Sequence, residues 1–372
     1  MDLTLTDDQR LIQSAARELL ESRAAAAGAR AVAGDPAGYS ARLWKEMTEL
    51  GWTGLALPEK HGGVGEGYLE LCLVIEELGR SRVPTPLLAT AACCGMPIAR
   101  HGTEAQQAEW LGAIARGQVM SYVTGGDGDD AADGAAGPAR GGVRAEPSGD
   151  GFVLDGEGSF VPYAEAAGQL LVTARHAGGP IAAVVDTSAP GVRREPLDVI
   201  AGPMGQVRFE RVAVPGARVI GGADSAAAAA VTGYGTAAVC AEMVGGAQGV
   251  LDLTVAYARE REQFGQPIGA FQAVAHHCAD MAIDVLASRL IAYEAIWRLA
   301  EGLDATVELS LAKSWVSDAY QRVCALGHQV HGAIGFTAEH DLHYFSRHAM
   351  ASALAFGDAG FHTERVAANL GI

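Results

Sequence analysis

The sequence has few basic residues, and this scarcity excludes one large class of function. Its 372 residues include 27 lysines and arginines against 44 aspartates and glutamates, for a formal charge of −17. A nucleic-acid-binding protein needs a basic face that replaces phosphate counterions, so we expect no nucleic-acid partner. Any anionic ligand must instead be held locally by particular Arg, Gln and main-chain N–H groups.

The chain also lacks a long apolar run and a basic leader. Apolar residues make up 49% of the sequence, yet no uninterrupted apolar stretch reaches the roughly 18 residues of a membrane-spanning helix. The first residues, Met1–Thr4, carry an aspartate and no basic residue, unlike a secretion signal. We therefore expect a soluble globular protein that is neither secreted nor embedded in a membrane.

Cysteine is scarce and scattered. The six cysteines form no CxxC pair, and several fall on apolar faces of predicted helices, which predicts buried thiols in a reducing cytoplasm. Neither disulfides nor a zinc site is expected from this spacing. The C-terminal histidines are too irregularly spaced to predict a metal site: His328, His331, His340, His343, His348 and His362.

The length suits two or three domains, and changes of pattern suggest their bounds. Residues 1–118 read as helical, residues 119–222 as short β-like runs, and residues 223–372 as long helices. Helices of this length in succession indicate an antiparallel bundle with another bundle or subunit on its outer side. We predict an α+β fold that is mostly α.

Individual elements follow from periodicity and caps. The expected helices cover residues 6–30, 41–51, 68–80, 86–100, 103–115, 225–262, 271–301 and 304–330, and the expected strands 152–155, 170–174, 181–186 and 207–214. Residues 125–151, rich in Gly, Ala and Asp, predict a mobile loop. The glycines of residues 57–65 lack the βαβ context of a dinucleotide-binding loop.

The first functional signal is the string REREQFGQPIGAFQAV, which covers residues 259–274. Gly265 permits a left-handed cap and Pro267 prevents continuation, so we expect a helix to end at Phe264–Gly265. Arg261 and Gln263 would then lie at a helix end and could grip a diphosphate and its ribose. An ordinary surface arginine and a cap are the alternative.

This string, with EELG at residues 76–79 and QVHGAIGF at residues 329–336, resembles the signature of the acyl-CoA dehydrogenase family. The resemblance covers nearly the whole chain and implies an N-terminal helical domain, a middle β domain and a C-terminal four-helix bundle. It also implies FAD as cofactor. Residues implied to contact the ADP half of a neighbouring subunit's FAD are Arg261, Gln263, Phe264, Gln329 and Gly332, whereas Ala333 replaces a family glycine.

The elements that hold the flavin ring in the family's own β domain are altered here. Thr124 keeps the threonine of the usual loop, but the aspartates among residues 125–130 would repel phosphate and pantetheine oxygens. In place of the family's Trp-Ile-Thr element, Phe160 could still pack on the flavin. Pro162 supplies neither a hydroxyl nor an N–H to the flavin edge.

The resemblance also implies a catalytic glutamate that this chain lacks. Dehydrogenation needs a carboxylate to remove the proton α to the thioester while the β carbon delivers hydride to the flavin. Phe356 aligns with the usual glutamate, and Gly235 or Thr236 with its alternative place. Asp358 could substitute or could simply cap a turn. Weaker candidates are Glu242, which could form an ion pair instead, Glu339 and Asp341.

Elements that reach a neighbour's FAD are kept, whereas those serving the flavin ring and the α proton are degraded. The hypothesis is a β-like partner subunit that acts on acyl-CoA with a second, base-carrying acyl-CoA dehydrogenase subunit. The tail, residues 356–362, is similar to actinobacterial subunits that pair as α2β2 tetramers in steroid side-chain degradation. Alternatives are an active homotetramer with a relocated base, a flavin-free structural or regulatory protein, and, more distantly, a flavin monooxygenase.

Overall fold

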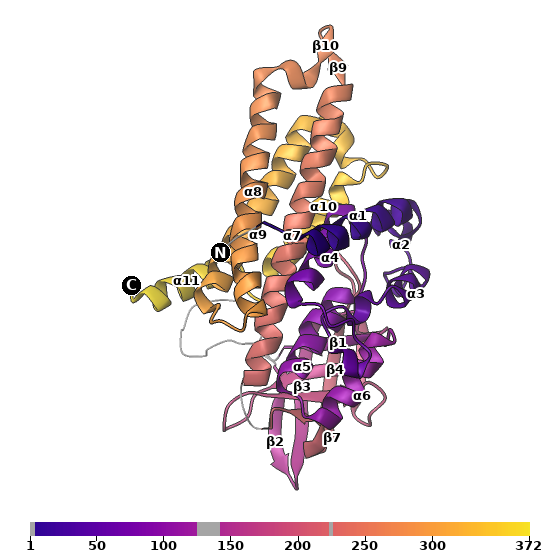
Figure 1. Cartoon of the computed structure of the whole chain (residues 1–372), viewed down its shortest axis with the longest axis vertical. Helices are drawn as coiled ribbons and strands as arrows, with labels where there is room; N and C mark the ends of the chain where they lie inside the picture. The colour runs from indigo at the N-terminus through magenta and orange to yellow at the C-terminus, as the bar shows by residue number, and fades with distance from the viewer. Residues whose placement is uncertain (1–3, 125–141, 223–225) are drawn as a thin grey trace. The chain divides into compact units, whose positions relative to one another are not determined.

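The computed structural model describes residues 4–124, 142–222 and 226–372. Its contacts define two compact units (Figure 1). The helical unit contains Met1–Asp35, Tyr68–Thr85 and Thr236–Ile372, and the sheet unit contains Pro36–Gly67 and Pro86–Gly235. The predicted α+β class, mostly α, is confirmed. The three domain bounds at residues 1–118, 119–222 and 223–372 remain a prediction.

The helical unit begins with a capped helix and ends with a bundle. Thr6 accepts a hydrogen bond from the N–H of Gln9, whose side chain binds back to Thr6, so a capping box starts the first helix. Gly28 interrupts that predicted helix, which therefore becomes two. The helices of this unit are α1 (Asp7–Ala27), α2 (Ala29–Val32), α4 (Tyr68–Ser81), most of α7 (Ala226–Glu260), α8 (Gln272–Ala300), α9 (Thr306–His331), α10 (Leu342–Leu354) and α11 (Ala359–Leu370).

Glycines let α4 cross α7 at close range. A Cβ built on Gly245 would lie 1.8 Å from the carbonyl oxygen of Glu76, and one on Gly79 would lie 2.1 Å from that of Glu242. Larger residues at either position would push the helices apart. The buried Glu76 carboxylate also binds α8, through Arg289 at 2.5 Å and the Tyr293 hydroxyl at 2.6 Å. The EELG segment thus holds three helices together.

Apolar side chains spaced three, four or seven residues apart on α8 are buried over its central part. Met281, Val285, Ala292 and Ile296 are at most 3% exposed. Among the described residues α7 is long and apolar enough, by length and composition, to cross a membrane, but 72% of its most apolar stretch is buried inside the protein. A core helix of a soluble protein passes the same test, so this is weak support for a membrane span.

The sheet unit contains two four-stranded sheets. In the first, β1 (Met120–Val123) runs parallel to β4 (Gln169–Ala174). β4 pairs with β5 (Ile181–Asp186), and β5 pairs with β8 (Val219–Ile220). In the second, the order is β2 (Arg144–Ser148), β3 (Gly151–Pro162), β7 (Met204–Val214) and β6 (Val192–Leu197), all antiparallel. The predicted loop at 125–151 is wrong for β2, and its residues 125–141 lie outside the described part.

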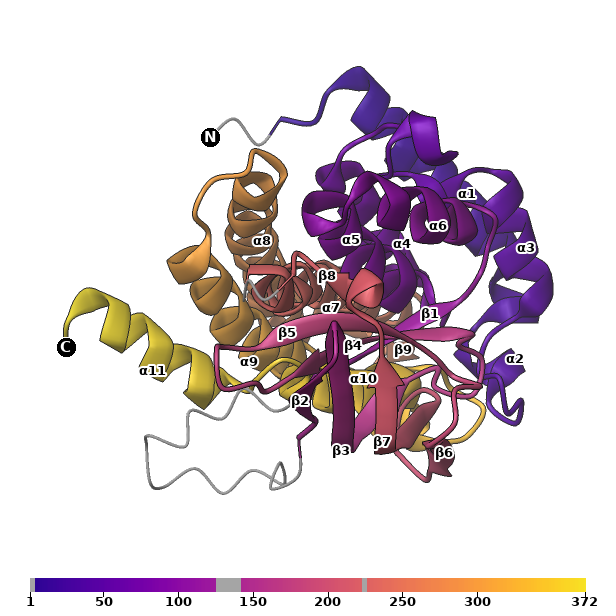
Figure 2. The same ribbon diagram turned by 90° about the horizontal axis from the view of Figure 1, so that it is seen from below.

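Short helices cover one face of the first sheet. They are a π-helical segment (Leu88–Gly95), α5 (Met96–His101) and α6 (Glu104–Ala115), whereas α3 (Ala41–Glu49) packs on the 3-10 turn Trp52–Gly54. Figure 2 shows α5 and α6 on one side of β4 and β5, with β3 and β7 on the other. The core between helices and sheet includes Ile98, Trp110, Leu171 and Val184. This packing fixes the β1 end, where Thr124 follows.

Candidate functional site

A short hairpin carries the residues predicted to reach a neighbouring FAD. Helix α7 ends at Glu260, so the predicted end at Phe264–Gly265 is wrong. Residues of β9 (Glu262–Gln263) pair with β10 (Gln266–Pro267), and Phe264 and Gly265 form the turn with φ of 53° and 79°. Two successive left-handed residues suit a two-residue hairpin turn, whereas the sequence alone suggested a helix cap.

The hairpin presents its side chains outward. Phe264 is 94% exposed, and its closest ring partner is Phe271, with centroids 6.1 Å apart. Within the described residues the Arg261 guanidinium has no hydrogen-bond or ion-pair partner, and the Gln263 amide bonds only the adjacent Glu262 carbonyl, at 2.8 Å. An exposed aromatic ring beside an unpaired arginine is typical of a surface that another molecule covers.

The second predicted element lies at the C-terminal end of α9. Gln329 is exposed, and Gly332 follows the helix with φ 64° and ψ −145°, a conformation that a residue with a Cβ adopts only with strain. A Cβ at Gly332 would meet nothing within 4 Å. The backbone conformation, and not crowding inside this chain, is therefore what requires glycine there.

An aromatic contact brings the two elements together. The rings of Tyr257 and His331 stack with centroids 4.6 Å apart and planes inclined by 19°. Tyr257 is one helical turn before Arg261, to whose N–H it offers its carbonyl at 2.8 Å, and His331 directly precedes Gly332. The hairpin and the end of α9 thus share one end of the helical unit, at the top of Figure 1. The sequence analysis did not identify Tyr257, and it considered His331 only as a metal ligand.

This end fits the ADP half of a dinucleotide cofactor. A guanidinium without a partner can bind a diphosphate bidentately, and exposed glutamine amides can bind ribose hydroxyls. The open space around Gly332 lets a ligand approach the main chain closely. These are properties of the residues present, and they suit an anionic ligand despite the acidic chain as a whole.

In the sheet unit, Thr124 follows β1 and Phe160 lies on β3, two strands that belong to different sheets and contact each other. Thr124 directly follows β1, and a Cβ on Gly158 of β3 would lie 2.3 Å from the Val123 side chain. Phe160 sits in a pairing irregularity of β3 with φ 58° and is 57% exposed. The Pro162 carbonyl accepts a hydrogen bond from the Ser121 hydroxyl. Residues 125–130, where the resemblance implies a flavin-holding loop, lie outside the described residues.

The turn at Phe356, where the resemblance led us to expect the family's glutamate, has engaged main-chain groups. Phe356 and Gly357 have φ of 59° and 101°. The ring nitrogen Nε2 of His362 lies 3.0 Å from the Phe356 carbonyl oxygen, and Lys313 Nζ donates to the Gly357 carbonyl at 2.9 Å. The turn is therefore held from both sides by buried side chains.

Lys313 is the functional neighbour that the sequence analysis missed. It is fully buried in α9 and also donates to the Ala353 carbonyl at 2.8 Å and to the Ser317 hydroxyl at 3.0 Å. Burial lowers its pKa to about 8. A lysine on the buried side of a helix was the available signal, since lysine is almost never fully buried without partners.

The candidate substitute bases already have other partners. Asp358 is exposed and caps α11 by accepting from the Phe361 N–H at 2.8 Å. Glu242 lies 3.2 Å from His348 Nε2 and 3.8 Å from Arg82. Burial acts to raise the pKa of Glu242, but His348 and Arg82 outweigh it and hold that pKa below its usual range. A carboxylate with a lowered pKa is a poor general base.

Arg30 of α2 binds the carboxylate of Asp341 but only the main chain of Glu339. Arg30 donates to the Glu339 main-chain carbonyl and pairs with the Asp341 carboxylate at 2.7 Å. In residues 4–124, 142–222 and 226–372, no group of three or more His, Cys, Asp or Glu side chains is arranged to hold a metal ion. All six cysteines are free thiols.

Comparison with known proteins assigns the family. Residues 6–118 match the acyl-CoA dehydrogenase N-terminal domain, and residues 225–371 match the acyl-CoA dehydrogenase C-terminal domain. The chain belongs to the acyl-CoA dehydrogenase family. Acyl-CoA dehydrogenase FadE27 of Mycobacterium tuberculosis is 30% identical over 342 residues, which cover 89% of this chain and 88% of that protein. FadE28 of the same organism is 32% identical, covering 82% and 85%.

Solved structures of this acyl-CoA dehydrogenase fold match over the full chain. A variant of the Tcur3481-Tcur3483 steroid ACAD is 31% identical with a TM-score of 0.89, covering 99% of both chains. The ChsE4-ChsE5 complex from Mycobacterium tuberculosis is 28% identical with a TM-score of 0.89, covering 100% of this chain and 99% of that one. The predicted enzyme class, an oxidoreductase of the acyl-CoA dehydrogenase type, is confirmed, and the family generally depends on FAD.

Proposed function

We propose that this chain is the β-like partner subunit of a heteromeric acyl-CoA dehydrogenase. It completes the FAD site of a second, base-carrying subunit, where the acyl-CoA thioester is desaturated between its α and β carbons. One observation carries the proposal: the hairpin and α9 end present unpaired Arg261 and exposed Phe264 and Gln329 at one place. By contrast, the Phe356 turn offers no unengaged carboxylate.

Each residue at this end has a distinct task in the proposal. Arg261 neutralises the diphosphate, Gln263 and Gln329 bind the ribose and adenine edges, and Phe264 covers an apolar face. Gly332 lets the main chain approach the ligand closely. FAD, when bound, supplies the hydride acceptor. This chain's own ring-side element is a weak holder, because Pro162 has no N–H and its carbonyl is already bound by Ser121.

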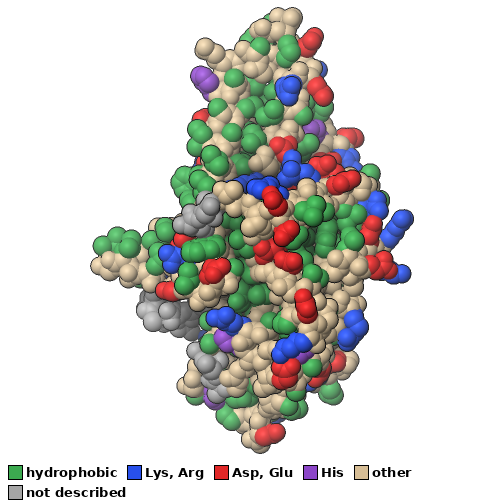
Figure 3. Space-filling view, in the orientation of Figure 1, with side chains coloured by type: hydrophobic (Ala, Val, Ile, Leu, Met, Phe, Trp, Pro, Cys, Tyr) green, Lys and Arg blue, Asp and Glu red, His purple; other side chains and the backbone are tan. Residues whose placement is uncertain are grey.

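Exposed apolar side chains on the bundle support assembly with other subunits. On α8, Ile283, Leu286 and Leu290 are 66%, 58% and 44% exposed, and on α9 Leu311 and Trp315 are 44% and 40% exposed. Figure 3 shows hydrophobic side chains over the α8 region. A surface of this kind is typical of one that another chain covers, and the helical order suits a homo- or heterotetramer. Solved relatives named as complexes support the heteromeric form.

The substrate and location complete the proposal. The acyl group is a steroid-derived thioester, for which the support is the 31% identity to a steroid ACAD. The location is the cytoplasm, for which the support is six unpaired cysteines. An active homotetramer would have the same substrate and location, so these two proposals do not depend on the partner-subunit role.

Purification of this chain with and without a partner tests the proposal. Alone, the chain is expected to lack stoichiometric flavin and acyl-CoA-dependent bleaching. Co-expressed with a second acyl-CoA dehydrogenase encoded beside it, it is expected to yield a yellow complex that the acyl-CoA bleaches. Flavin and bleaching in the chain alone would instead identify an active homotetramer with a relocated base such as Asp358. If no flavin-containing complex assembles, a flavin-free structural role replaces the proposal.

A further inference from the structure

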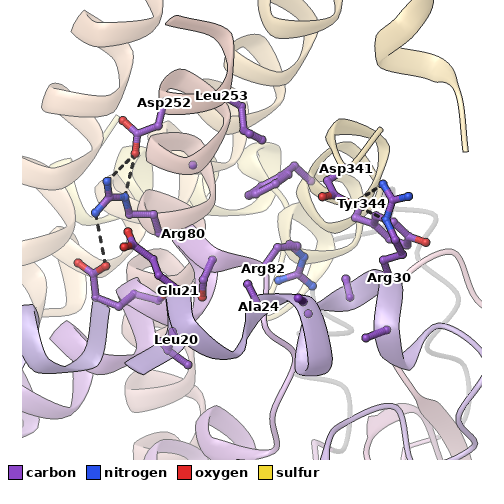
Figure 4. Close-up of a pocket in the computed structure, with 18 of the residues that line it drawn as sticks. Leu20, Glu21, Ala24, Arg30, Arg80, Arg82, Asp252, Leu253, Asp341 and Tyr344 are labelled. Carbon is purple, nitrogen blue, oxygen red and sulfur yellow. Dashed lines mark hydrogen bonds and ion pairs between the residues drawn. The ribbon is translucent and has the colours of Figure 1, made fainter. Parts of the chain in front are cut away.

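A cavity in the helical unit contains an arginine that the proposed FAD site does not use. The cavity has a volume of about 640 Å³ and is bounded by α1, the α1–α2 turn, the end of α4, α7 and the start of α10 (Figure 4). Every lining residue belongs to the helical unit. Its volume lies in the range of small-molecule sites.

Small residues on facing helices make the hollow. Ala24 and Gly28 line it from the α1 side, and Gly249 and Ala256 line it from α7. Longer side chains at these positions would fill the space between the helices. Leu20, Leu253 and Phe345 add larger apolar surfaces to its wall. The cavity is therefore partly apolar and able to accept a hydrocarbon group.

Three of the four arginines that line the cavity are tied up in close ion pairs. Arg17 pairs with Glu77 at 2.7 Å, Arg80 with Asp252 at 2.8 Å, and Arg30 with Asp341 at 2.7 Å. Figure 4 shows the Arg80–Asp252 and Arg30–Asp341 pairs among the lining residues. Within each pair the carboxylate neutralises the arginine, so these three guanidinium groups have little capacity left to bind a ligand.

Arg82 is different, because its only ion pair is a longer one and two of its guanidinium nitrogens have no hydrogen bond among the described residues. Its side chain is 11% exposed, and Nε and Nη1 have no hydrogen-bond partner among the described residues. The nearest carboxylate oxygen, Oε1 of Glu242, is 3.8 Å from Nη1, and the other Glu242 oxygen is 3.2 Å from His348. A buried cationic donor without an acceptor is costly, so an acceptor is expected at this place.

The main chain at Arg82 is also held in an unusual conformation. Its φ is 50°, and its N–H and carbonyl bind the Gly79 carbonyl at 3.2 Å and the Ala29 N–H at 2.9 Å. Glycine or asparagine would adopt this left-handed conformation with less strain. Strained residues of this kind cluster at ligand sites, where the side chain rather than the backbone explains the choice of residue.

We propose that this cavity binds a small monocarboxylate with an apolar body, whose carboxylate is held by Arg82. A guanidinium is the side-chain group best suited to hold a carboxylate, and Arg82 is the lining arginine without a close ion pair. Glu21, Glu77, Asp252 and Asp341 also line the cavity, so a single negative charge is favoured over a phosphate dianion. The apolar body lies against Leu20, Leu253 and Phe345. This site is independent of the proposed FAD role.

Titration of the purified full-length chain with octanoate tests the proposal, with octanol and octyl phosphate as probes of the same apolar length. Calorimetry is expected to show saturable binding of about one octanoate per chain and affinities for the other two about tenfold lower or less. Arg82→Gln is expected to lower octanoate affinity by about tenfold or more, whereas Arg10→Gln, at an exposed arginine outside the cavity, leaves it unchanged. No saturable binding, equal binding of octanol, or tighter binding of octyl phosphate overturns the proposal.

A second variant keeps the test valid if Arg82→Gln fails to fold. Ala256→Leu fills the cavity from an exposed helix position and removes no charge. It is expected to abolish octanoate binding, whereas Ala325→Leu, at an exposed position of α9 outside the cavity, is expected to retain it. Binding to Ala256→Leu at the affinity of the unaltered chain overturns the site. So does loss of octanoate binding in the assembled heteromer, because a partner's acidic side chain would then occupy the cavity.

Discussion

Two Phe-Gly turns of the helical unit share a backbone shape and differ in everything around it. Phe264–Gly265 has φ of 53° and 79°, and Phe356–Gly357 has φ of 59° and 101°. The first turn projects Phe264 into the solvent, 94% exposed, whereas the second is half-buried and bound by Lys313 and His362. Identical dipeptides thus form, respectively, a surface available to another molecule and a closed structural joint.

The comparison shows that only the surroundings of a strained turn indicate whether it has a functional role. A positive φ at a non-glycine residue signals a constraint but does not name its kind. Near Phe264 the Arg261 guanidinium has no partner among the described residues, as a binding surface requires. At Phe356 all three engaged carbonyls, of Ala353, Phe356 and Gly357, have donors inside the chain.

Substituting the glycine of each turn should separate the two turns most strongly. A Cβ at Gly357 would lie 2.3 Å from the Phe361 ring, whereas one at Gly265 would meet nothing within 4 Å. Gly357→Ala is expected to lower the free energy of unfolding by about 2–4 kcal/mol, from strain and overlap together. Gly265→Ala should lower it by about 1 kcal/mol, from strain alone. Urea unfolding of both variants measures this, and equal losses would refute the distinction.

Removal of the buried amine should loosen the closed turn. Lys313→Met leaves the Ala353 and Gly357 carbonyls without their donor and is expected to cost about 2 kcal/mol in the free energy of unfolding. Lys45→Met, at a side chain 79% exposed, is the matched control and should change stability by less than about 0.5 kcal/mol. If the two variants unfold alike, Lys313 does not hold the turn.

His362, the second side chain that binds the Phe356–Gly357 turn, should make the stability depend on pH. Burial lowers the pKa of His362 to about 4. As the pH falls from about 6.5 towards 4, His362 therefore becomes protonated in the unfolded chain but stays neutral in the folded chain. Stability contributed by the neutral ring is therefore lost across that window as the pH falls.

His362→Gln keeps a donor for the Phe356 carbonyl and removes the titration. The free energy of unfolding, measured by thermal unfolding, should then fall less between pH 6.5 and 4, by on the order of 1 kcal/mol. The exposed His276→Gln should leave the slope as it is. An unchanged slope in His362→Gln would show that other groups dominate acid sensitivity.

The open hairpin should tolerate substitution without loss of stability. Arg261→Ala is expected to change the free energy of unfolding by less than about 0.5 kcal/mol, since Arg261 has no partner among the described residues. In the assembled heteromer, however, it should lower flavin content, whereas Arg259→Ala, exposed two residues away, should not. Flavin retained by both variants would break the proposed link between hairpin and cofactor.

Regular periodic elements could be predicted from the sequence, and the local exceptions could not. The strand Ile181–Asp186 and the core of α8 follow from hydrophobic spacing, which records burial directly. The hairpin after Glu260 was missed because a glycine such as Gly265 is common both in helix caps and in hairpin turns. The strand Arg144–Ser148 was missed because four of its five side chains are exposed and its apolar pattern is weak.

The candidate site was predictable in its members and not in its arrangement. Motif spacing identified Arg261, Gln263, Phe264, Gln329 and Gly332, but nothing in the spacing says that Tyr257 and His331 stack. Likewise, Phe356 could be recognised as a residue that cannot accept a proton. That Lys313, over forty positions earlier, binds the same turn depends on how α9 packs against α10 and α11.

Residue identity and periodicity are properties of the chain alone, so the sequence was enough to assign the family and the α+β class. Tertiary structure decided which groups are engaged. It paired Glu242 with His348, made Asp358 a helix cap, and left Nε and Nη1 of Arg82 without a hydrogen bond among the described residues. The physical reason is that a charged group's role depends on its partners and burial, and these come from segments far apart along the chain.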